Sequence, residues 1–442
     1  MTGHEFAQRL VDEGLDPAEL PAKAALYDRA ANVLADAGGA SNAWWVPGRL
    51  ELFGKHTDYA GGRTLVSAVP RGFVFVSSPR TDDNIVVTDA GNGEHVCLSQ
   101  ARLPLSGWRR YADVVARRLS RNFPGRSQGM TIAFASDLPR ASGMSSSTAL
   151  VVGIATALIE RRELSRTDVW RRDIRSLRDL ASYLACVENG SGFGHLAGDA
   201  GVGTHGGSED HVAMLLGLPS HFSAYAFAPV RHIRDARLPS EWRVVVASSG
   251  VSAEKTGGSQ APYNHLAEGA RVLLQLWNEH EVPGESLGAI LASSAAAPDR
   301  MRELVERSAA AEWPVEHLQR RLRHFENEDA CVLAAVRALE EIDDAALGEI
   351  SRMSQQNAEQ LLRQQVPETS ALAQEARSCG AFAACSFGAG FGGSVWALVE
   401  RGRAEQFASE WLARYRQRHE APRAVAFVAT PGPAVTHIRG FR

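Results

Sequence analysis

Residues 138–150 read LPRASGMSSSTAL, a run of proline, glycine and serine that joins an apolar strand to an apolar helix. The strand is expected at Met130–Ala135, and the helix begins near Thr148. Such a turn presents backbone N–H groups and serine hydroxyls at a helix N-terminus, where the helix dipole favours an anion. Gly143 lets a ligand approach the backbone closely. The stretch therefore predicts an anion-binding turn, and a serine N-cap on a buried helix is the alternative.

Two further segments combine glycine with ionisable or small residues. Residues 387–394 read FGAGFGGS and precede an apolar strand, and residues 46–59 read VPGRLELFGKHTDY. In this order, the three segments resemble the three signature motifs of the galactokinase, homoserine, mevalonate and phosphomevalonate (GHMP) kinase superfamily. Gly48-Arg49 followed by His56-Thr57-Asp58-Tyr59 is similar to the galactokinase branch. The resemblance covers roughly residues 42–434.

The pattern of apolar residues predicts an α+β fold. Strands are expected at 43–46, 64–68, 73–78, 84–88, 130–135 and 242–248, and helices at 108–122, 147–162, 174–189, 318–322 and 329–342. Two domains fit this order, a first spanning residues 1–225 and a second spanning 226–442. The resemblance implies a GHMP-kinase-like fold with the active site in the cleft between them. The glycine-rich segment 387–394 is expected to pack against the serine-rich turn.

Bulk properties narrow the class of protein. The 442 residues carry a net charge of −4 and are 45% hydrophobic, which gives no general reason to expect a nucleic-acid partner. The five cysteines lack CxxC spacing, so they favour a reducing compartment over a zinc site. No apolar run reaches the ~18 residues of a membrane span, and no signal-peptide core is recognised. We expect a cytoplasmic protein without a membrane partner, either a monomer or a weak homo-oligomer.

The resemblance implies a general base and a cationic partner for it. Asp210 in the segment GGSEDH is the best match to the family's catalytic aspartate, and Glu209 is the alternative. The glycine-rich loop before it, residues 190–207, is longer than in the family. Arg49 matches the arginine beside this aspartate, where a guanidinium favours the ionised carboxylate and offsets charge on the sugar oxygen. Without the neighbouring motif, Arg49 would read as an exposed residue of a turn.

Nucleotide and metal ligands are implied in the same way, with ATP and Mg²⁺ as cofactors. Gly143, Ser145 and Ser147 would hold phosphate, and Ser146 would ligate Mg²⁺ together with Glu188. Mg²⁺ prefers hard oxygen ligands of this kind. A solvated glutamate at a helix end is the alternative for Glu188.

Aromatic and polar residues complete the implied site. Trp108 and Tyr111 match an aromatic pair near adenine, although a tryptophan packed on the core is the alternative. His56, Asp58 and Tyr59 match the sugar-binding residues of the family. Asp58 could accept from two adjacent hydroxyls, and this geometry distinguishes sugar epimers. Tyr263 matches a further sugar contact, or is a surface tyrosine in a polar turn.

Lys55 is the sharpest departure from the family, which has glutamate there. A lysine facing the sugar would suit a uronic acid or another modified sugar or cyclitol. Alternatively, Lys55 pairs with Glu51, which stands where the family usually has asparagine. Ala141, Phe387 and Ser394 also depart from the family pattern.

The prediction is an ATP- and Mg²⁺-dependent kinase that transfers the γ-phosphate to a sugar hydroxyl, expected to be the anomeric one. A non-catalytic sugar-sensing regulator is the alternative from another class. A kinase of mevalonate or homoserine is a third reading, which the segment 56–59 disfavours.

Overall fold

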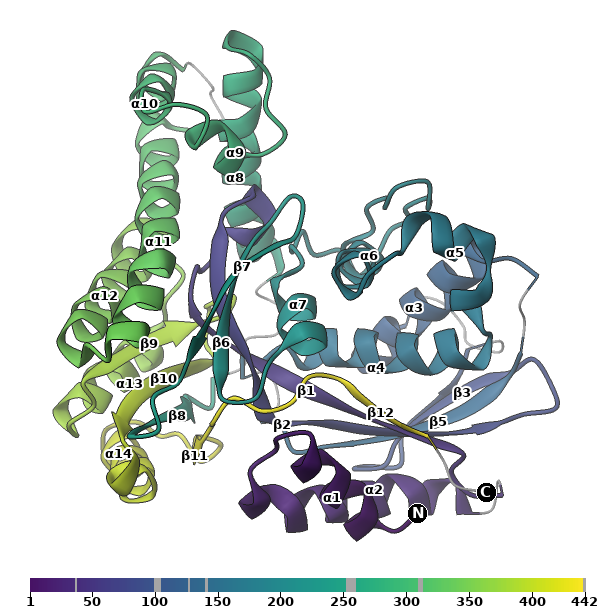
Figure 1. Ribbon diagram of the computed structural model, residues 1–442. Coiled ribbons are helices and arrows are strands. Elements are labelled where there is room, and N and C mark those ends of the chain that lie inside the picture. The colour runs from purple at the N-terminus through teal and green to yellow at the C-terminus, as the bar shows by residue number, and fades with distance from the viewer. Residues whose placement is uncertain are drawn as a thin grey trace.

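The computed structural model describes residues 1–35, 38–98, 105–125, 128–139, 142–251, 260–308 and 313–439. Two β-sheets organise these residues, and helices cover them (Figure 1). In the described part of the chain, no helix combines the length and apolar character needed to cross a membrane.

The first sheet has eight strands, built from segments far apart in the sequence. Its main path runs β12-β1-β2-β5-β3-β4; off this path, β6 pairs with the first residues of β2, and β7 pairs with β6. Neighbouring strands are antiparallel except for β3 and β5. The strands are β1 Asn42–Phe53, β2 Arg63–Pro79, β3 Ile85–Asp89, β4 His95–Cys97, β5 Met130–Ser136, β6 His221–Ala226, β7 Arg231–Arg237 and β12 Thr436–Arg439.

Helices cover both faces of this sheet, which explains why β1 and β2 are buried along nearly their whole length (Figure 1). The N-terminal helices pack on one face through their own apolar cluster. Five further helices, most of which carry candidate site residues, pack on the other face. The first group comprises α1 Gly3–Asp12 and α2 Leu20–Val33, and the second comprises α3 Trp108–Asn122, α4 Ser146–Arg161, α5 Asp168–Asp173, α6 Leu177–Asn189 and α7 Glu209–Leu216.

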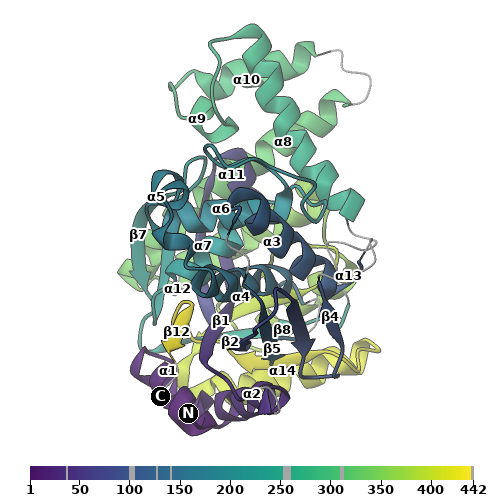
Figure 2. The same cartoon turned by 90° about the vertical axis from the view of Figure 1, so that its right-hand side faces the viewer.

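The second sheet has four antiparallel strands in the order β11-β8-β10-β9. Three helices project from the body beside the start of α11 and share a separate apolar cluster (Figure 2). The strands are β8 Trp242–Ser248, β9 Ala383–Phe387, β10 Ser394–Glu400 and β11 Val425–Val428; the projecting helices are α8 Gln260–His280, α9 Leu287–Leu291 and α10 Ala297–Arg307; the remaining helices are α11 Val315–Glu341, α12 Asp344–Gln356, α13 Pro367–Ser378 and α14 Ala404–Arg418.

The structure confirms the α+β class and changes two local predictions. The segments 64–68 and 73–78 form one strand, because the turn-like residues around Pro70 lie opposite the irregular register at Gly48. The two helices expected at 318–322 and 329–342 are one continuous helix, α11. The boundary expected between residues 225 and 226 does not divide the sheets, since β7 and β12 both complete the first one.

Candidate active site

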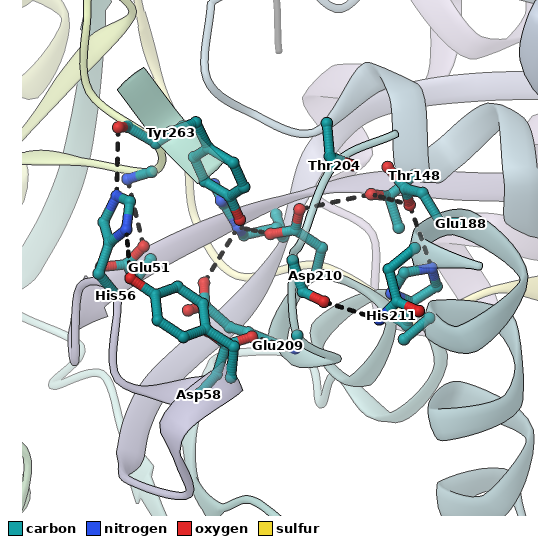
Figure 3. Close-up of a pocket in the computed structure, with 18 residues that line it drawn as sticks. Glu51, His56, Asp58, Thr148, Glu188, Thr204, Glu209, Asp210, His211 and Tyr263 are labelled. Carbon is teal, nitrogen blue, oxygen red and sulfur yellow. Dashed lines mark hydrogen bonds and ion pairs between the residues drawn. The ribbon is translucent and has the colours of Figure 1, made fainter. Parts of the chain in front are cut away.

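One pocket collects residues from all three sequence motifs. Figure 3 shows two ends with Asp210 between them: Glu51, His56, Asp58, Glu209 and Tyr263 lie at one end, and Thr148, Glu188, Thr204 and His211 at the other. We call these the sugar end and the phosphate end, after the ligands that the resemblance in sequence implies for their residues. The sugar end receives residues from β1, from the turn after it, from α7 and from α8.

Arg49 and Asp210 form a buried ion pair at the centre of the pocket. Arg49 Nε lies 2.5 Å from Asp210 Oδ1, and Nη1 donates to the Gly143 carbonyl at 2.6 Å. Burial alone would lower the pKa of Arg49, but Asp210 and the neighbouring glutamates raise it above its ordinary value. Arg49 therefore remains a cation and joins β1 to the serine-rich turn.

Close packing of that turn against β1 depends on Gly48. A Cβ at this position would lie 2.7 Å from the Leu138 side chain and 3.1 Å from the Met144 carbonyl. The same carbonyl accepts a hydrogen bond from the Arg49 N–H at 3.3 Å. A larger residue would push the turn away from the arginine, so the glycine fixes the spacing.

The first turn of α7 carries both candidate bases. Asp210 faces Arg49 directly, whereas Glu209 Oε1 lies 3.2 Å from Arg49 Nε outside hydrogen-bond geometry. The Glu209 N–H donates to Asp58 Oδ2 at 3.1 Å, so the segment 56–59 also anchors this helix start. Burial, and then the nearby Glu51, raise the pKa of Glu209 well above its usual range. The geometry favours Asp210 over Glu209 as the ionised partner of Arg49.

Ser145, Ser146 and Ser147 lie at the start of α4, as predicted. Ser145 adopts a left-handed conformation with φ 57°, and its buried hydroxyl makes no hydrogen bond with the described residues. The helix N-terminus and this hydroxyl suit a phosphate group. Ala141, named above as a departure from the family, lies outside the described residues.

Thr148 and His211 lie at the phosphate end and were not predicted as site residues. The Thr148 hydroxyl lies 3.0 Å from Glu188 Oε2 and 3.3 Å from Asp210 Oδ2, so it links the two candidate carboxylates. His211 Nε2 lies 3.3 Å from Glu188 Oε2. Their positions in the sequence could have identified them as site residues, because Thr148 follows Ser147 and His211 follows Asp210.

The donors at the phosphate end fit Mg²⁺ better than a softer metal held by protein alone. Glu188 supplies a buried carboxylate next to the hydroxyl-bearing start of α4. Among the described residues, no group of three or more His, Cys, Asp or Glu side chains is placed to hold a metal ion. Mg²⁺ is commonly bound by one or two carboxylates together with substrate phosphates and water, which such a site allows.

His56, Tyr59 and Tyr263 converge at the sugar end. His56 Nδ1 lies 2.9 Å from the Tyr59 hydroxyl, and its ring is 5.4 Å from that of Tyr263. Arg321 of α11 was not predicted, and it donates to the His56 carbonyl at 2.7 Å and to the Tyr59 hydroxyl at 3.2 Å. Tyr263 is buried in the pocket wall rather than exposed in a polar turn.

Glu51 also lines the sugar end, where it accepts a hydrogen bond from the Gly388 N–H at 3.2 Å. Its other oxygen, Oε1, is buried and makes no hydrogen bond with a described residue. Burial raises the pKa of Glu51 to about 7, although Arg49 and Lys55 act in the opposite direction. Strand periodicity was the missed signal, since residues 49 and 51 of β1 point to the same face.

Lys55 does not line the pocket, which contradicts its prediction as a sugar-binding residue. The side chain is fully buried, with Nζ 3.2 Å from Glu328 Oε1 and 3.3 Å from Cys385 Sγ, and it also donates to the Ser354 hydroxyl. The ion pair with Glu51, which was the alternative, does not form either, because Lys55 pairs with Glu328. The same Glu328 oxygen accepts from the Gly54 and Lys55 N–H groups, which turns the lysine away from the pocket.

The predicted aromatic pair packs on the core. Trp108 contacts Phe134 edge-to-face at 5.2 Å and donates from Nε1 to Glu94 at 3.2 Å. Tyr111 is a member of the main apolar cluster. Neither residue lines the pocket. Both lie on α3, apart from the other predicted site residues.

The glycine-rich turn between β9 and β10 packs against the serine-rich turn, as predicted. A Cβ on Gly388 would lie 2.9 Å from the Gly143 carbonyl, and φ of Gly388 is +78°. The Ser394 hydroxyl donates to the Ser142 carbonyl at 2.6 Å. The second sheet thereby contributes Gly388 and Ala389 to the pocket.

Three family models match the chain over the segments that build this pocket. They are the galactokinase galactose-binding signature at residues 36–79, the GHMP kinases N terminal domain at 110–218 and the GHMP kinases C terminal domain at 335–417. The first match contains β1, β2 and the turn between them, and the second contains α4, α6 and the start of α7.

Whole-chain comparisons agree with these matches. The chain is 27% identical to a galactokinase of Roseiflexus sp. (strain RS-1), over 84% of this chain and 86% of that protein. It is 28% identical to a galactokinase of Mycobacterium bovis, over 89% and 98% of the two chains. The structure of Lactococcus lactis galactokinase complexed with galactose superposes with a TM-score of 0.75 at 20% identity, covering 93% of this chain and 99% of that one.

Proposed function

The chain belongs to the GHMP kinase superfamily, in its galactokinase-like part, and we propose that it phosphorylates the anomeric hydroxyl of galactose. It is an ATP-dependent sugar kinase. The proposal is carried by one observation: the Arg49–Asp210 pair lies between the galactose-binding signature and the serine-rich start of α4.

Asp210 is proposed as the base that accepts the proton of the attacking hydroxyl. That oxygen forms a bond to the γ-phosphorus while the bond from the phosphorus to the β,γ-bridging oxygen breaks, so ADP leaves. Arg49 pairs with Asp210 and places a fixed positive charge beside the reacting oxygen. His56, Asp58, Tyr59 and Tyr263 are proposed to hold the sugar, since they line the end of the pocket next to this pair.

Gly143, Ser145 and Ser147 are proposed to hold the nucleotide phosphates, and Ser146 and Glu188 to ligate Mg²⁺. Bound Mg²⁺ supplies neutralisation of the charge on the phosphate oxygens. The single Thr148 hydroxyl proton lies between the Glu188 and Asp210 carboxylates and can be donated to either one. Arg321 orients the His56 backbone and the Tyr59 hydroxyl from behind the sugar end.

The geometry removes the reason for a uronic acid substrate, because Lys55 is bonded to Glu328 outside the pocket. Carboxylates, which would repel an anionic sugar, outnumber cations in the pocket lining. The regulator alternative has no residue in its favour, since Arg49 and Asp210 are both present and paired.

A sugar panel with ATP tests the proposal. Galactose, other hexoses, uronic acids and cyclitols are compared by ADP release, and we expect galactose to be phosphorylated. Asp210→Asn should lower kcat by ~10²–10⁴-fold, as removal of a general base does, while galactose binding changes less than about tenfold. No turnover of any sugar by the parent protein, or full turnover by Asp210→Asn together with loss in Glu209→Gln, would reject the assignment.

A further inference from the structure

The sugar end of the pocket carries more negative than positive groups. Arg49 is the one arginine or lysine among the described residues that line the whole pocket. Its guanidinium is engaged by Asp210 and by the Gly143 carbonyl, and its Nε also lies 3.2 Å from Glu209 Oε1, outside hydrogen-bond geometry. The carboxylates in the lining are those of Glu51, Asp58, Glu188, Glu209 and Asp210.

Two of these carboxylates have an oxygen that no described residue hydrogen-bonds. Glu51 Oε1 comes from β1 and Glu209 Oε1 from the first turn of α7, and both side chains are at least nine-tenths buried. The second oxygen of Glu51 binds a backbone N–H of the second sheet, which fixes the carboxylate in the pocket wall. Figure 3 shows Glu51 and Glu209 near His56 and Asp58.

The other nearby cation, the Lys55 ammonium group, forms no ion pair with the Glu51 or Glu209 carboxylate. Lys55 is four residues from Glu51, yet it is fully engaged by Glu328, Ser354 and Cys385 outside the pocket. Burying a carboxylate without a full set of partners costs free energy. The raised pKa values of Glu51 and Glu209 show the same cost as a preference for the protonated form. A ligand that brings a positive charge removes this cost.

We propose that the sugar end selects galactose-type sugars bearing a protonated amino group, which the Glu51 and Glu209 carboxylates bind together. The proposal rests on the proposed function, because it takes this pocket as the sugar site. An ammonium group offers three donors and a full charge, whereas a hydroxyl offers one donor and leaves the acidic excess uncompensated. The same arrangement rejects sugar carboxylates.

The test compares four sugars with ATP at about pH 6.5, where aliphatic amines are mainly protonated. The probes are galactose, 2-amino-2-deoxygalactose, 6-amino-6-deoxygalactose and galacturonic acid. We expect kcat/KM for one amino sugar to exceed that for galactose by about tenfold or more, and that for galacturonic acid to fall below it. The preferred amino sugar identifies the carbon that faces the two glutamates.

Glu51→Gln and Glu209→Gln keep the shape of each side chain and remove its charge. For each variant, kcat/KM for the amino sugar divided by kcat/KM for galactose should fall by about tenfold. The corresponding ratio of calorimetric affinities should fall to the same extent. Glu349→Gln is the matched control, because Glu349 is exposed on α12 and pairs with Arg352 far from the pocket lining. Its ratio should equal that of the parent protein.

Two results would overturn the inference: a parent protein that prefers galactose to both amino sugars, or a preference that neither glutamine variant changes. The first comparison needs no variant, so a misfolded variant does not hide the answer. Phosphorylation of galactose without any preference for an amino sugar rejects this inference alone. Tight calorimetric binding of an amino sugar without phosphorylation of any sugar rejects the proposed function alone.

Discussion

Glu51 and Lys55 stand four residues apart, and both are buried, yet their surroundings differ. Lys55 is surrounded by a carboxylate, a hydroxyl and a thiol that satisfy its ammonium group. Glu51, which lines the pocket, has one satisfied oxygen and one buried oxygen that no described residue hydrogen-bonds.

This difference separates two uses of a buried charge. A charge with a full set of partners holds elements together, and here Lys55 ties the turn after β1 to α11, α12 and β9. A buried charge that lacks a hydrogen-bond partner and lies beside a cavity is available to bind a ligand. Burial alone would not have distinguished the two residues, because both are almost inaccessible to solvent.

The largest effect is expected at Lys55. Lys55→Met leaves the Glu328 carboxylate buried without its cation, so the free energy of unfolding should fall by about 3–5 kcal/mol. Urea denaturation of Lys55→Met, Glu328→Gln and the double variant measures this, and the double variant should recover part of the loss. Unchanged stability combined with altered sugar preference would mean that Lys55 acts in the pocket after all.

Glu51→Gln should raise the free energy of unfolding, which is opposite to the change expected for Lys55→Met. The size of this increase should depend on pH. The pKa of Glu51 is about 7 in the folded protein and 4.5 in an unperturbed glutamate. The folded state therefore holds the proton more tightly, so this group's contribution to stability is complete below about pH 4.5 and is lost as pH rises through 7. Arg49 and Lys55 limit the shift, while Glu328 and Asp210 increase it, and Glu209 lies in the same pocket.

Thermal unfolding at several pH values checks this prediction. Above pH 7 the glutamine variant should be more stable than the parent by about 1–3 kcal/mol, and near pH 4.5 the two should match. Glu349→Gln serves as the exposed control and should follow the parent at every pH. A constant difference between Glu51→Gln and the parent across the range would contradict the raised pKa.

Glu188→Gln sharpens the comparison within the pocket, because Glu188 and Glu209 are buried carboxylates at opposite ends. Loss of the proposed metal ligand should raise the Mg²⁺ concentration needed for half-maximal rate by about tenfold, with less change in the sugar KM. Ser146→Ala should act in the same direction. Glu209→Gln should leave the Mg²⁺ requirement unchanged, and equal Mg²⁺ requirements in all three variants would refute the metal assignment.

The smallest effect is expected at Trp108, which the structure places on the core beside Phe134. Trp108→Ala should lower the free energy of unfolding by about 1 kcal/mol, the size typical of an aromatic pair, and should leave the KM for ATP unchanged. Chemical denaturation and initial-rate kinetics distinguish the outcomes. A higher KM for ATP at unchanged stability would instead support stacking on adenine.

The sequence alone determined the α+β class and the placement of the three motifs around one pocket. The start of α4 was readable because proline, glycine and serine there leave few backbone conformations, and the central pair followed from resemblance to the family. The β6–β7 hairpin was missed because β7 is mostly exposed and charged, so it lacks the alternation of apolar residues that marks a half-buried strand.

Only the tertiary structure decided which way the charges near β1 point. Strand periodicity places Glu51 beside Arg49, but Lys55 follows the end of the strand at Gly54, where alternation no longer applies. Its direction is set by Glu328, which is 273 residues away in the chain and binds the backbone and the side chain of Lys55. Local sequence determined the elements, whereas partners distant in sequence determined which buried charges were satisfied and which were left facing the pocket.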